Sequence, residues 1–235
     1  MGDARFPSWD GAFNLADLGG LPLRAGGHTA HRRVFRSGRP ESMTAEGWRS
    51  LRADGVTTVV DLRNESERAR TASDPDVSAS VTAGLDVIAA PTEVPNDPLF
   101  RQVCGPWLDH PRSYPDNLRL FPTLLSVAFY AIADAKGGTL VHCSAGRDRT
   151  GMVVAVLLSL SGVTVEAIAA DYSRAYRVAA QRSGAPRKEP AVLEADVSER
   201  ALSLTEWLAE FDAAGYLLNA GMPEESVVRL AARLS

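Results

Sequence analysis

One stretch of the chain combines a cysteine and an arginine at a spacing suited to phosphate chemistry. Five residues separate Cys143 from Arg149, and two of them, Ala145 and Gly146, are small. A loop of this length can curl so that its backbone N–H groups converge on one point, where the positive end of a following helix also attracts an anion. A guanidinium can then hold two phosphate oxygens at once. The spacing therefore predicts a phosphate-binding loop with a nucleophile inside it.

The side chains of this loop predict transfer of phosphate through the cysteine. A thiol near a helix N-terminus and a guanidinium has its pKa lowered from about 8.5 to roughly 3.5–7.5, so Cys143 is expected to be a thiolate at neutral pH. The thiolate would attack phosphorus, and water would hydrolyse the phosphocysteine in a second step. Gly146 permits the turn of the backbone, and the Thr150 hydroxyl is expected to donate a hydrogen bond to the thiolate.

Apolar segments on both sides of the loop must position it. The run 139–141 is typical of a strand and the run 152–160 of a helix, which places the loop at the carboxyl end of a strand, where α/β sheets bind ligands. The run 56–62 predicts a second parallel strand that delivers Asp61 and Arg63 to the same edge. These two residues could orient the loop or contact substrate, or they could form a helix cap or an ion pair at the surface.

The segment from His142 to Gly151 reads His-Cys-Ser-Ala-Gly-Arg-Asp-Arg-Thr-Gly and resembles the signature of the cysteine-dependent protein tyrosine phosphatase superfamily. It is most similar to the loop of bacterial tyrosine/serine phosphatases, usually His-Cys-x-Ala-Gly-Lys-Asp-Arg-Thr-Gly, whose mycobacterial and listerial members also act on phosphoinositides. Four further segments resemble elements of that family: 14–20, 36–38, 61–63 and 171–173. The resemblance implies an α/β fold with a central, mainly parallel sheet flanked by helices and a lid insertion before the phosphate loop.

The motif and the resemblance together assign three groups of site residues. Catalytic roles are predicted for Cys143, Arg149 and Asp148, phosphate binding for Ser144, Ala145, Gly146, Arg147 and Thr150, and supporting roles for His142, Asp61 and Arg63. Arg147 replaces the lysine usual in the family but keeps its charge, so a polyanionic substrate such as a phosphoinositide remains a candidate. Ala16 replaces the usual arginine, which favours a structural turn for its segment over contact with substrate.

Two positions for the general acid remain open. Asp148 lies inside the loop, where the family carries aspartate and where it could protonate the leaving group. Its two arginine neighbours should favour the charged form, whereas bound phosphate and the thiolate add negative charge. The other position is a carboxylate of the lid, with Glu93, Asp97 and Asp109 in range. We favour Asp148.

The 235 residues predict a single phosphatase domain, 1–235, with an insertion at about 90–119 that contains six prolines. This insertion is either a lid over the site or an ordered surface excursion. The expected strands are 33–36, 56–62, 81–89 and 139–142. The expected helices are 44–53, 118–135, 152–160, 165–176 and one that starts near 223. The segment 181–190 is expected to be an exposed loop.

The composition limits the partners and the location. A net charge of −4 gives no support for binding nucleic acid, and no apolar run is long enough for a signal peptide or for membrane insertion. The protein is expected in the cytoplasm, with export lacking a recognisable signal left open. Cys143 and Cys104 are too few for a disulfide framework, and Cys104 is expected to be buried. No metal or other cofactor is expected, and the oligomeric state is not indicated.

The predicted activity is hydrolysis of phosphomonoesters. The substrate would be a phosphotyrosine protein, with phosphoserine/threonine proteins or phosphoinositides as further possibilities. Two other classes remain as alternatives: a catalytically idle phospho-binding module that uses the same loop for recognition, and a rhodanese-like sulfur transferase, which also uses a loop cysteine.

Overall fold

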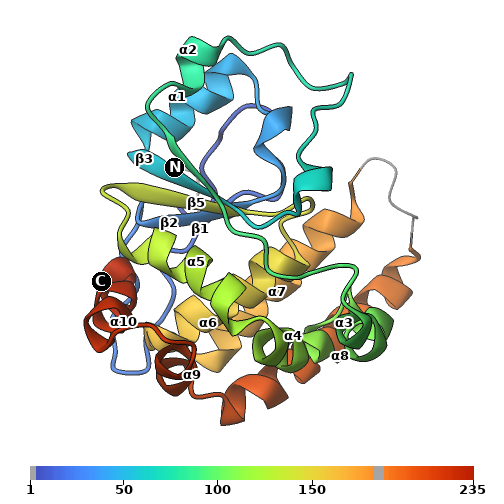
Figure 1. Ribbon diagram of the computed structural model, residues 1–235. Coiled ribbons are helices and arrows are strands. Elements are labelled where there is room, and N and C mark those ends of the chain that lie inside the picture. The colour runs from blue at the N-terminus through green and yellow to red at the C-terminus, as the bar shows by residue number, and fades with distance from the viewer. Residues whose placement is uncertain (1–3, 183–187) are drawn as a thin grey trace.

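A computed structural model describes residues 4–182 and 188–235 and has a central sheet with helices on both faces (Figure 1). The sheet has five strands in the order β1-β2-β5-β3-β4. Its strands are β1 (Ala16–Asp17), β2 (Val34–Ser37), β3 (Val56–Asp61), β4 (Asp86–Ala89) and β5 (Gly138–His142). Only the β1–β2 pairing is antiparallel. The expected α/β fold with a mainly parallel sheet flanked by helices is therefore confirmed.

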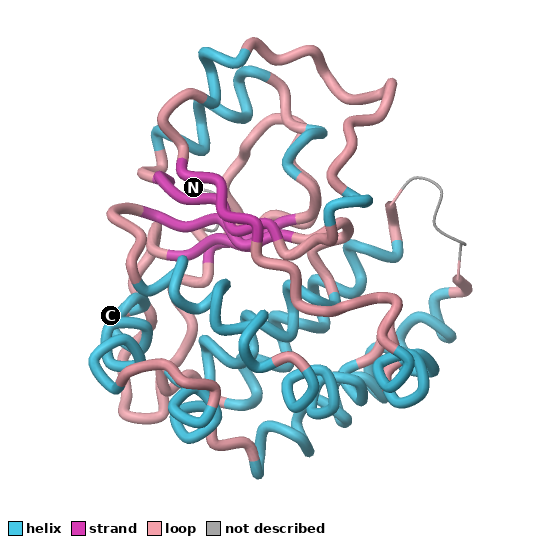
Figure 2. The backbone as a smooth tube through the Cα atoms, viewed as in Figure 1, coloured by secondary structure: helices cyan, strands magenta, loops and turns pink. Residues whose placement is uncertain are grey.

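Helices divide unequally between the two faces of the sheet. Those of the described residues are α1 (Ala45–Ala53), α2 (Ala79–Thr82), α3 (Pro98–Val103), α4 (Tyr114–Leu120), α5 (Pro122–Ala133), α6 (Asp148–Leu160), α7 (Val165–Ala180), α8 (Pro190–Glu210), α9 (Ala213–Asn219) and α10 (Glu224–Ala231). In the view of Figure 2, the strands lie between a small layer that contains α1 and α2 and a larger layer that contains α5, α6 and α10.

The alternating direction of side chains along the buried strands explains the two layers of helices. Successive side chains of a strand point to opposite faces. Val34, Val60 and Val141 belong to the larger apolar cluster, which includes the buried face of α6. The next residue of β2, Phe35, joins Leu51 of α1 in the smaller cluster. Both faces of the sheet are thus covered, as is usual for parallel strands.

The ends of the central strands lie together at one edge. Ser37 of β2 and Asp61 of β3 both pair with His142, the last residue of β5. Because parallel strands end at the same edge, the segments that follow these three residues meet there. One of these segments begins with Cys143.

Several predicted elements agree with the structure. Helix α1 begins after Thr44, whose side chain accepts a hydrogen bond from the Gly47 amide, and it ends before Gly55, whose φ is +85°. Helix α7 begins where expected but continues to Ala180, so it is four residues longer than predicted. Of the predicted loop 181–190, the described positions 181–182 and 188–190 are exposed, and 183–187 lie outside the described residues.

Two predicted elements are wrong. The strand expected over 81–89 is a short helix, α2, followed by the four-residue strand β4, because Ser78 caps the helix and Gly84, with φ +82°, turns the chain. The single helix expected over 118–135 is broken into α4 and α5 at Phe121, whose φ and ψ are −126° and 46°. The break follows from Pro122, which lacks an amide donor and disfavours a helical conformation in the residue before it.

The insertion at 90–119 contains short helices rather than irregular chain. It includes α3 and most of α4, with two single turns of 3-10 helix, Gly105–Trp107 and Pro111–Ser113, between them. Cys104 is buried here, as expected, and burial raises the pKa of its thiol to about 11. The insertion is therefore ordered, and it supplies part of the wall of the pocket described below.

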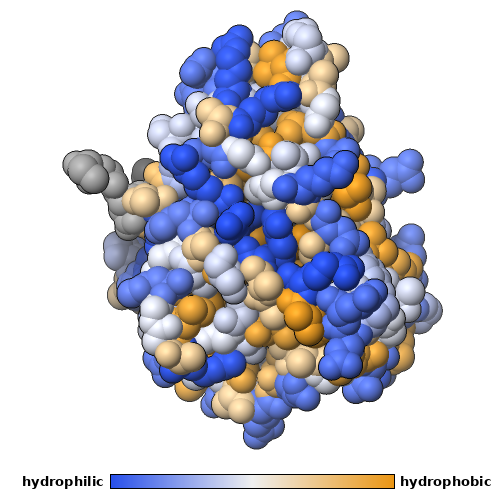
Figure 3. All heavy atoms as spheres, turned by 90° about the vertical axis from the view of Figure 1, so that its left-hand side faces the viewer, coloured by the Kyte–Doolittle hydropathy of each residue, from blue (hydrophilic) through white to orange (hydrophobic). Residues whose placement is uncertain are grey.

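The surface opposite the carboxyl edge of the sheet is mixed in character. Figure 3 shows the face on the left of Figure 1, where hydrophilic residues form a band across the middle and apolar residues lie in separate patches. Outside the residues drawn in grey, this face has no single continuous apolar area of the kind that marks interaction sites.

Within residues 4–182 and 188–235, no helix is both long and apolar enough to cross a bilayer.

Candidate active site

The loop from Cys143 to Arg147 joins β5 directly to α6. It passes so close to the end of β2 that a Cβ atom on Gly146 would lie 2.4 Å from the carbonyl oxygen of Ser37. The φ angle of Gly146 is +67°, a region that other residues rarely adopt. Both observations explain why the loop needs glycine at this position.

A cavity of about 280 Å³ lies over this loop. Nine residues line it: Glu93, Leu108, Asp109, Cys143, Ser144, Ala145, Arg147, Asp148 and Arg149. The first three belong to the insertion and the other six to the loop and the start of α6. The structure thus brings the predicted nucleophile, the predicted arginine and both candidate positions for the acid to one pocket.

Arg149 is held by a carboxylate that the sequence analysis did not single out. Its two terminal nitrogens lie 2.5 and 2.6 Å from the carboxylate oxygens of Glu67, and the Ser144 hydroxyl donates to the same carboxylate at 3.0 Å. These hydrogen bonds lower the pKa of Glu67 to about 2. Burial alone would lower the pKa of Arg149, but its bonds with Glu67 raise it overall. We call this contact of Glu67 with Ser144 and Arg149 the side-chain clamp.

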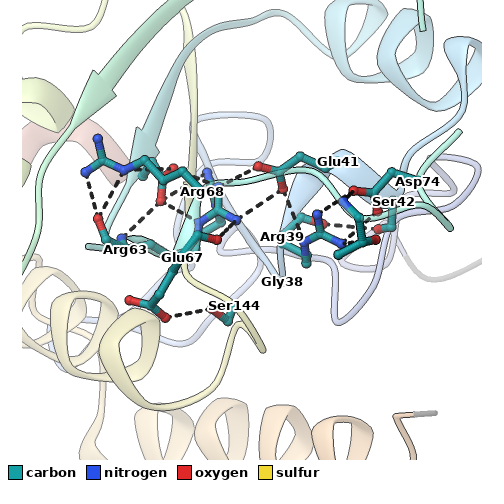
Figure 4. A network of polar contacts seen from close by, with 12 residues as sticks. Gly38, Arg39, Glu41, Ser42, Arg63, Glu67, Arg68, Asp74 and Ser144 are labelled. Atoms are coloured by element: carbon teal, nitrogen blue, oxygen red, sulfur yellow. Dashed lines mark hydrogen bonds and ion pairs between the residues drawn. The ribbon is translucent and has the colours of Figure 1, made fainter. Parts of the chain in front are cut away.

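Asp61 and Arg63 lie behind the clamp and do not line the pocket. Arg63 donates to Asp61 at 2.8 and 2.9 Å and to Glu41 at 2.6 Å. Its Nη1 also donates to the backbone carbonyl of Glu67 at 3.3 Å, so Arg63 supports the segment that carries the clamp (Figure 4). Burial raises the pKa of Asp61, but its bonds with Arg63 outweigh burial and lower it overall. The structure thus contains an ion pair, but a buried one and not the surface pair considered from the sequence.

His142 lies directly before the loop, at the end of β5. It is almost fully buried, and its Nδ1 lies 3.3 Å from the carbonyl oxygen of Cys143. Its Nε2 lies 3.9 Å from Asp61. Burial lowers the pKa of the imidazole in spite of this carboxylate, which favours a neutral ring.

Asp148 begins α6 and faces the pocket. The Nε of Arg147 donates to it at 2.7 Å, while its second oxygen, Oδ1, is buried without a hydrogen-bond partner in the described part of the chain. Burial raises the pKa of Asp148 and outweighs the attraction of Arg147. Arg147 favours the charged form, as expected of a neighbouring arginine, but desolvation is the larger effect and the pKa lies above its ordinary value.

Arg147 reaches from the loop toward the insertion. It forms an ion pair with Asp109 at 3.0 Å, and its guanidinium lies 5.3 Å from the ring centroid of Tyr176. Asp109 is mostly exposed. Arg147 therefore stands between the phosphate loop, the insertion and α7.

The other carboxylates of the insertion differ in position. Glu93 lies 3.7 Å from Arg149, and burial raises its pKa. Asp97 accepts a hydrogen bond from the Phe100 amide at the start of α3 and does not line the pocket, which removes it as an acid candidate.

The Thr150 hydroxyl does not make the expected contact. Thr150 is fully buried, and its Oγ1 has no hydrogen-bond partner among the described residues. The expected hydrogen bond to the sulfur of Cys143 is thus not formed.

Asn14 and Arg36 contact the far side of the loop, and Asp171 holds Arg36. Asn14, Arg36 and Asp171 lie in segments whose resemblance to family elements was noted, but no role in the site was predicted for them. Glu67 also had a local signal, because its side chain and that of Asn64 form a capping box around the turn Glu65–Glu67. Among the described residues, no group of three or more histidine, cysteine, aspartate or glutamate side chains is placed to hold a metal ion.

Comparison with known proteins identifies the family of the chain. A family model described as "Tyrosine phosphatase family" matches residues 7–235, so the chain belongs to the tyrosine phosphatase family. A putative tyrosine-protein phosphatase of Cupriavidus necator is 30% identical over 184 residues, which are 70% of this chain and 61% of that protein. The triple specificity protein phosphatase PtpB of Mycobacterium tuberculosis is 30% identical over 195 residues, which are 70% of this chain and 67% of that protein.

Two further similarities are more limited. A tyrosine-protein phosphatase of Nostoc commune is 29% identical over 136 residues, which are 53% of this chain and 42% of that protein. The crystal structure of P. aeruginosa TpbA aligns with a TM-score of 0.37 and 18% identity, over 81% of this chain and 88% of that one. The chain thus spans between about two fifths and two thirds of the curated relatives that it matches.

Proposed function

We propose that the protein is a phosphatase that hydrolyses phosphomonoesters, with phosphotyrosine proteins as its principal substrates, through a phosphocysteine intermediate. The observation that carries this proposal is the placement of Cys143 and Arg149 in one pocket, on a loop that leads from a buried strand into the N-terminus of α6. Family membership supports the same reaction class.

The first step would transfer the phosphoryl group to sulfur. The Cys143 sulfur attacks phosphorus, a P–S bond forms and the P–O bond to the leaving group breaks. Arg149 and the loop amides Ala145, Gly146 and Arg147 hold the phosphate oxygens, while a carboxylic acid donates the proton to the departing oxygen. In the second step water attacks phosphorus, the P–S bond breaks, and the same carboxylate takes the proton from water.

Asp148 is the better candidate for this acid. It lies in the pocket with its pKa raised by burial, which keeps the carboxyl protonated to a higher pH than an exposed aspartate. Glu93 also lines the pocket with a raised pKa, but its nearest charged partner is Arg149, the group that would hold the phosphate. Glu93 is the second candidate.

The test of the reaction class is release of phosphate from p-nitrophenyl phosphate. The wild type should hydrolyse it, and Cys143→Ser should lose at least about a thousandfold in kcat. The second cysteine offers a matched control, because Cys104→Ser lies outside the pocket and should retain activity. An inactive wild type that still binds phosphate would favour the idle binding module, and thiosulfate:cyanide sulfur transfer would favour a rhodanese-like enzyme.

The test of the acid compares Asp148→Asn with Glu93→Gln on two leaving groups. Loss of the true acid should lower kcat roughly 10²- to 10⁴-fold for phosphotyrosine and much less for p-nitrophenyl phosphate, whose leaving group needs little protonation. The alkaline limb of the pH–rate profile should also disappear. Equal losses for both substrates with Asp148→Asn would contradict the assignment and indicate a role in loop structure.

Substrate choice is proposed to depend on Arg147. Its guanidinium lines the pocket beside the phosphate loop and offers a second positive charge to a polyanionic substrate. If phosphoinositides or phosphoserine/threonine peptides are also substrates, a panel of these compounds should reveal their hydrolysis. Arg147→Gln should then reduce the activity on phosphoinositides more than the activity on a phosphotyrosine peptide.

A further inference from the structure

The phosphate loop turns three successive carbonyl groups away from the pocket. The carbonyl oxygen of Ser144 accepts a hydrogen bond from the backbone amide of Arg39 at 3.1 Å. Those of Ala145 and Gly146 accept from the side-chain amide of Asn14 at 3.0 and 3.3 Å. These donors come from the N-terminal part of the chain, far from the loop in sequence, and Arg182 adds a longer contact of 3.5 Å to the Ser144 carbonyl.

The direction of these carbonyls fixes the direction of the amides. In a trans peptide the N–H group points opposite to the C=O group of the same plane. The carbonyls of Ser144, Ala145 and Gly146 share planes with the amides of residues 145, 146 and 147. Holding the carbonyls on the far side therefore aims these amides at the pocket. No hydrogen bond from the three amides to another described residue is present, so they are available to an anion.

A buried charge reinforces the carbonyl of Gly146. Arg36 of β2 donates to it through one terminal nitrogen at 2.8 Å and to Asp171 of α7 through the other at 2.5 Å. Arg36 and Asp171 are each only 1% exposed. Arg5 also donates to Asp171, at 2.8 Å. Because an unpaired charge at this depth is costly, Asp171 fixes the orientation of the guanidinium.

Asn14 has an unusual backbone conformation and a further hydrogen bond to α7. Its φ is +54°, a left-handed value that asparagine tolerates better than most residues. Its amide also donates to the Ala175 carbonyl of α7 at 3.0 Å, so one side chain ties the loop to the helix that carries Asp171. The residue is 4% exposed and cannot reach solvent or substrate directly.

We propose that Asn14, Arg36 and Asp171 are positioning residues that hold the phosphate loop with its amides toward the substrate phosphate. We call these three residues the carbonyl cradle. This proposal rests on the proposed function, since it assigns a task within the same pocket. The proposal assigns one task to residues of three segments, the outermost of which, at positions 14 and 171, are 157 positions apart in the sequence.

The experiment measures binding of tungstate, a stable mimic of the phosphate anion, separately from turnover. Asn14→Gly is the main variant because glycine accepts the positive φ while removing all three hydrogen bonds. It should weaken tungstate binding and lower kcat/KM about tenfold each. Arg36→Lys, which keeps the charge but cannot bond both partners, should do the same.

A matched control separates positioning from simple destabilisation. Thr29 lies in the same N-terminal segment, is buried, and bonds the backbone of Leu18 and Leu21 rather than the loop. Thr29→Val should lower the melting temperature yet leave tungstate affinity and kcat/KM as in the wild type at 25 °C.

The possible outcomes separate the cradle from the proposed function. Wild-type affinity and kcat/KM in Asn14→Gly would overturn the cradle, and so would a loss of affinity in Thr29→Val in proportion to its melting temperature. If Arg36→Lys does not fold, Asn14→Gly alone decides. A wild type that binds tungstate but hydrolyses no phosphomonoester would contradict the proposed function, while the binding comparison would still test the cradle.

Discussion

The two supports of the phosphate loop differ in what they hold and in how deeply they lie. The side-chain clamp joins Glu67 to Arg149 and Ser144, with side chains that are 31% and 18% exposed for Glu67 and Arg149. The carbonyl cradle holds backbone atoms, and both Arg36 and Asp171 are 1% exposed. The clamp thus fixes groups that can still move, whereas the cradle fixes the backbone itself.

The difference in burial predicts that loss of the cradle and loss of the clamp have unequal effects. A buried ion pair depends on both partners, because removal of one leaves a charge without solvent. A partly exposed pair keeps solvent as a substitute partner, so its loss costs less. We therefore expect the cradle to determine whether the pocket exists and the clamp to determine how firmly Arg149 is held in it.

The largest effect on stability is expected from Arg36→Met. The change removes the fully buried partner of Asp171, which keeps its bond to Arg5, and removes a donor from the Gly146 carbonyl, so the free energy of unfolding should fall by about 3–5 kcal/mol in urea titrations. Arg177→Met is the control, because Arg177 pairs with Glu194 through two bonds at an exposed site, so this variant should lose far less stability than Arg36→Met. Equal losses in the two variants would show that the buried pair of the cradle contributes no more to stability than an exposed pair.

A smaller loss is expected from Gly146→Ala. The new methyl would meet the Ser37 carbonyl at 2.4 Å and would force alanine to a φ of +67°, which together should cost about 2–4 kcal/mol and lower kcat/KM at least tenfold. Gly26→Ala has a similar φ of +88° but nothing within 4 Å, so it isolates the backbone strain at about 1 kcal/mol. Similar results for both glycines would mean that the contact with β2 is unimportant.

The clamp should give a moderate, pH-dependent effect. The pKa of Glu67 is lowered from 4.5 to about 2 in the folded protein, so its ion pair contributes stability above pH 4.5 that is lost as the pH falls toward 2. Glu67→Gln should therefore lower the free energy of unfolding by about 1–2 kcal/mol at pH 7 and leave it nearly unchanged near pH 2. A difference between wild type and variant that persists undiminished at pH 2 would contradict the ion pair.

The smallest effect is expected from Asp109→Asn. Its partner Arg147 is largely covered, but Asp109 itself is 75% exposed, so solvent screens the pair. The change in the free energy of unfolding should stay below about 0.5 kcal/mol in chemical denaturation and should vanish in 0.5 M salt. A loss above 1 kcal/mol would mean that this exposed ion pair contributes as much to stability as a buried one.

The sequence predicted the chemistry of the pocket better than its surroundings. The spacing of Cys143 and Arg149 and the apolar runs beside them were sufficient to predict the loop, the strand before it and the helix after it, because these features depend on neighbours in sequence. The break at Phe121 had a local signal in Pro122, which the apolar pattern of the surrounding helix concealed. The strand predicted over 81–89 failed for a similar reason, since Gly84 divides that apolar run.

The electrostatics of the site needed the tertiary structure. From the sequence, two adjacent arginines suggest a charged Asp148, yet burial raises its pKa, and burial depends on packing against distant segments. The partner of Arg149 is equally remote, because Glu67 lies 82 positions away.

The sequence by itself located the proposed nucleophile and the proposed anion-binding arginine, and it predicted the glycine of the turn and the α/β class, since each depends on local spacing or on the period of apolar residues. Only the tertiary structure decided which way the loop faces and what holds it there. The donors to its carbonyls lie at Asn14, Arg36 and Arg39, and the clamp lies at Glu67. Parallel strands bring these positions to one edge of the sheet, and the order of strands is not a property of any single stretch of sequence.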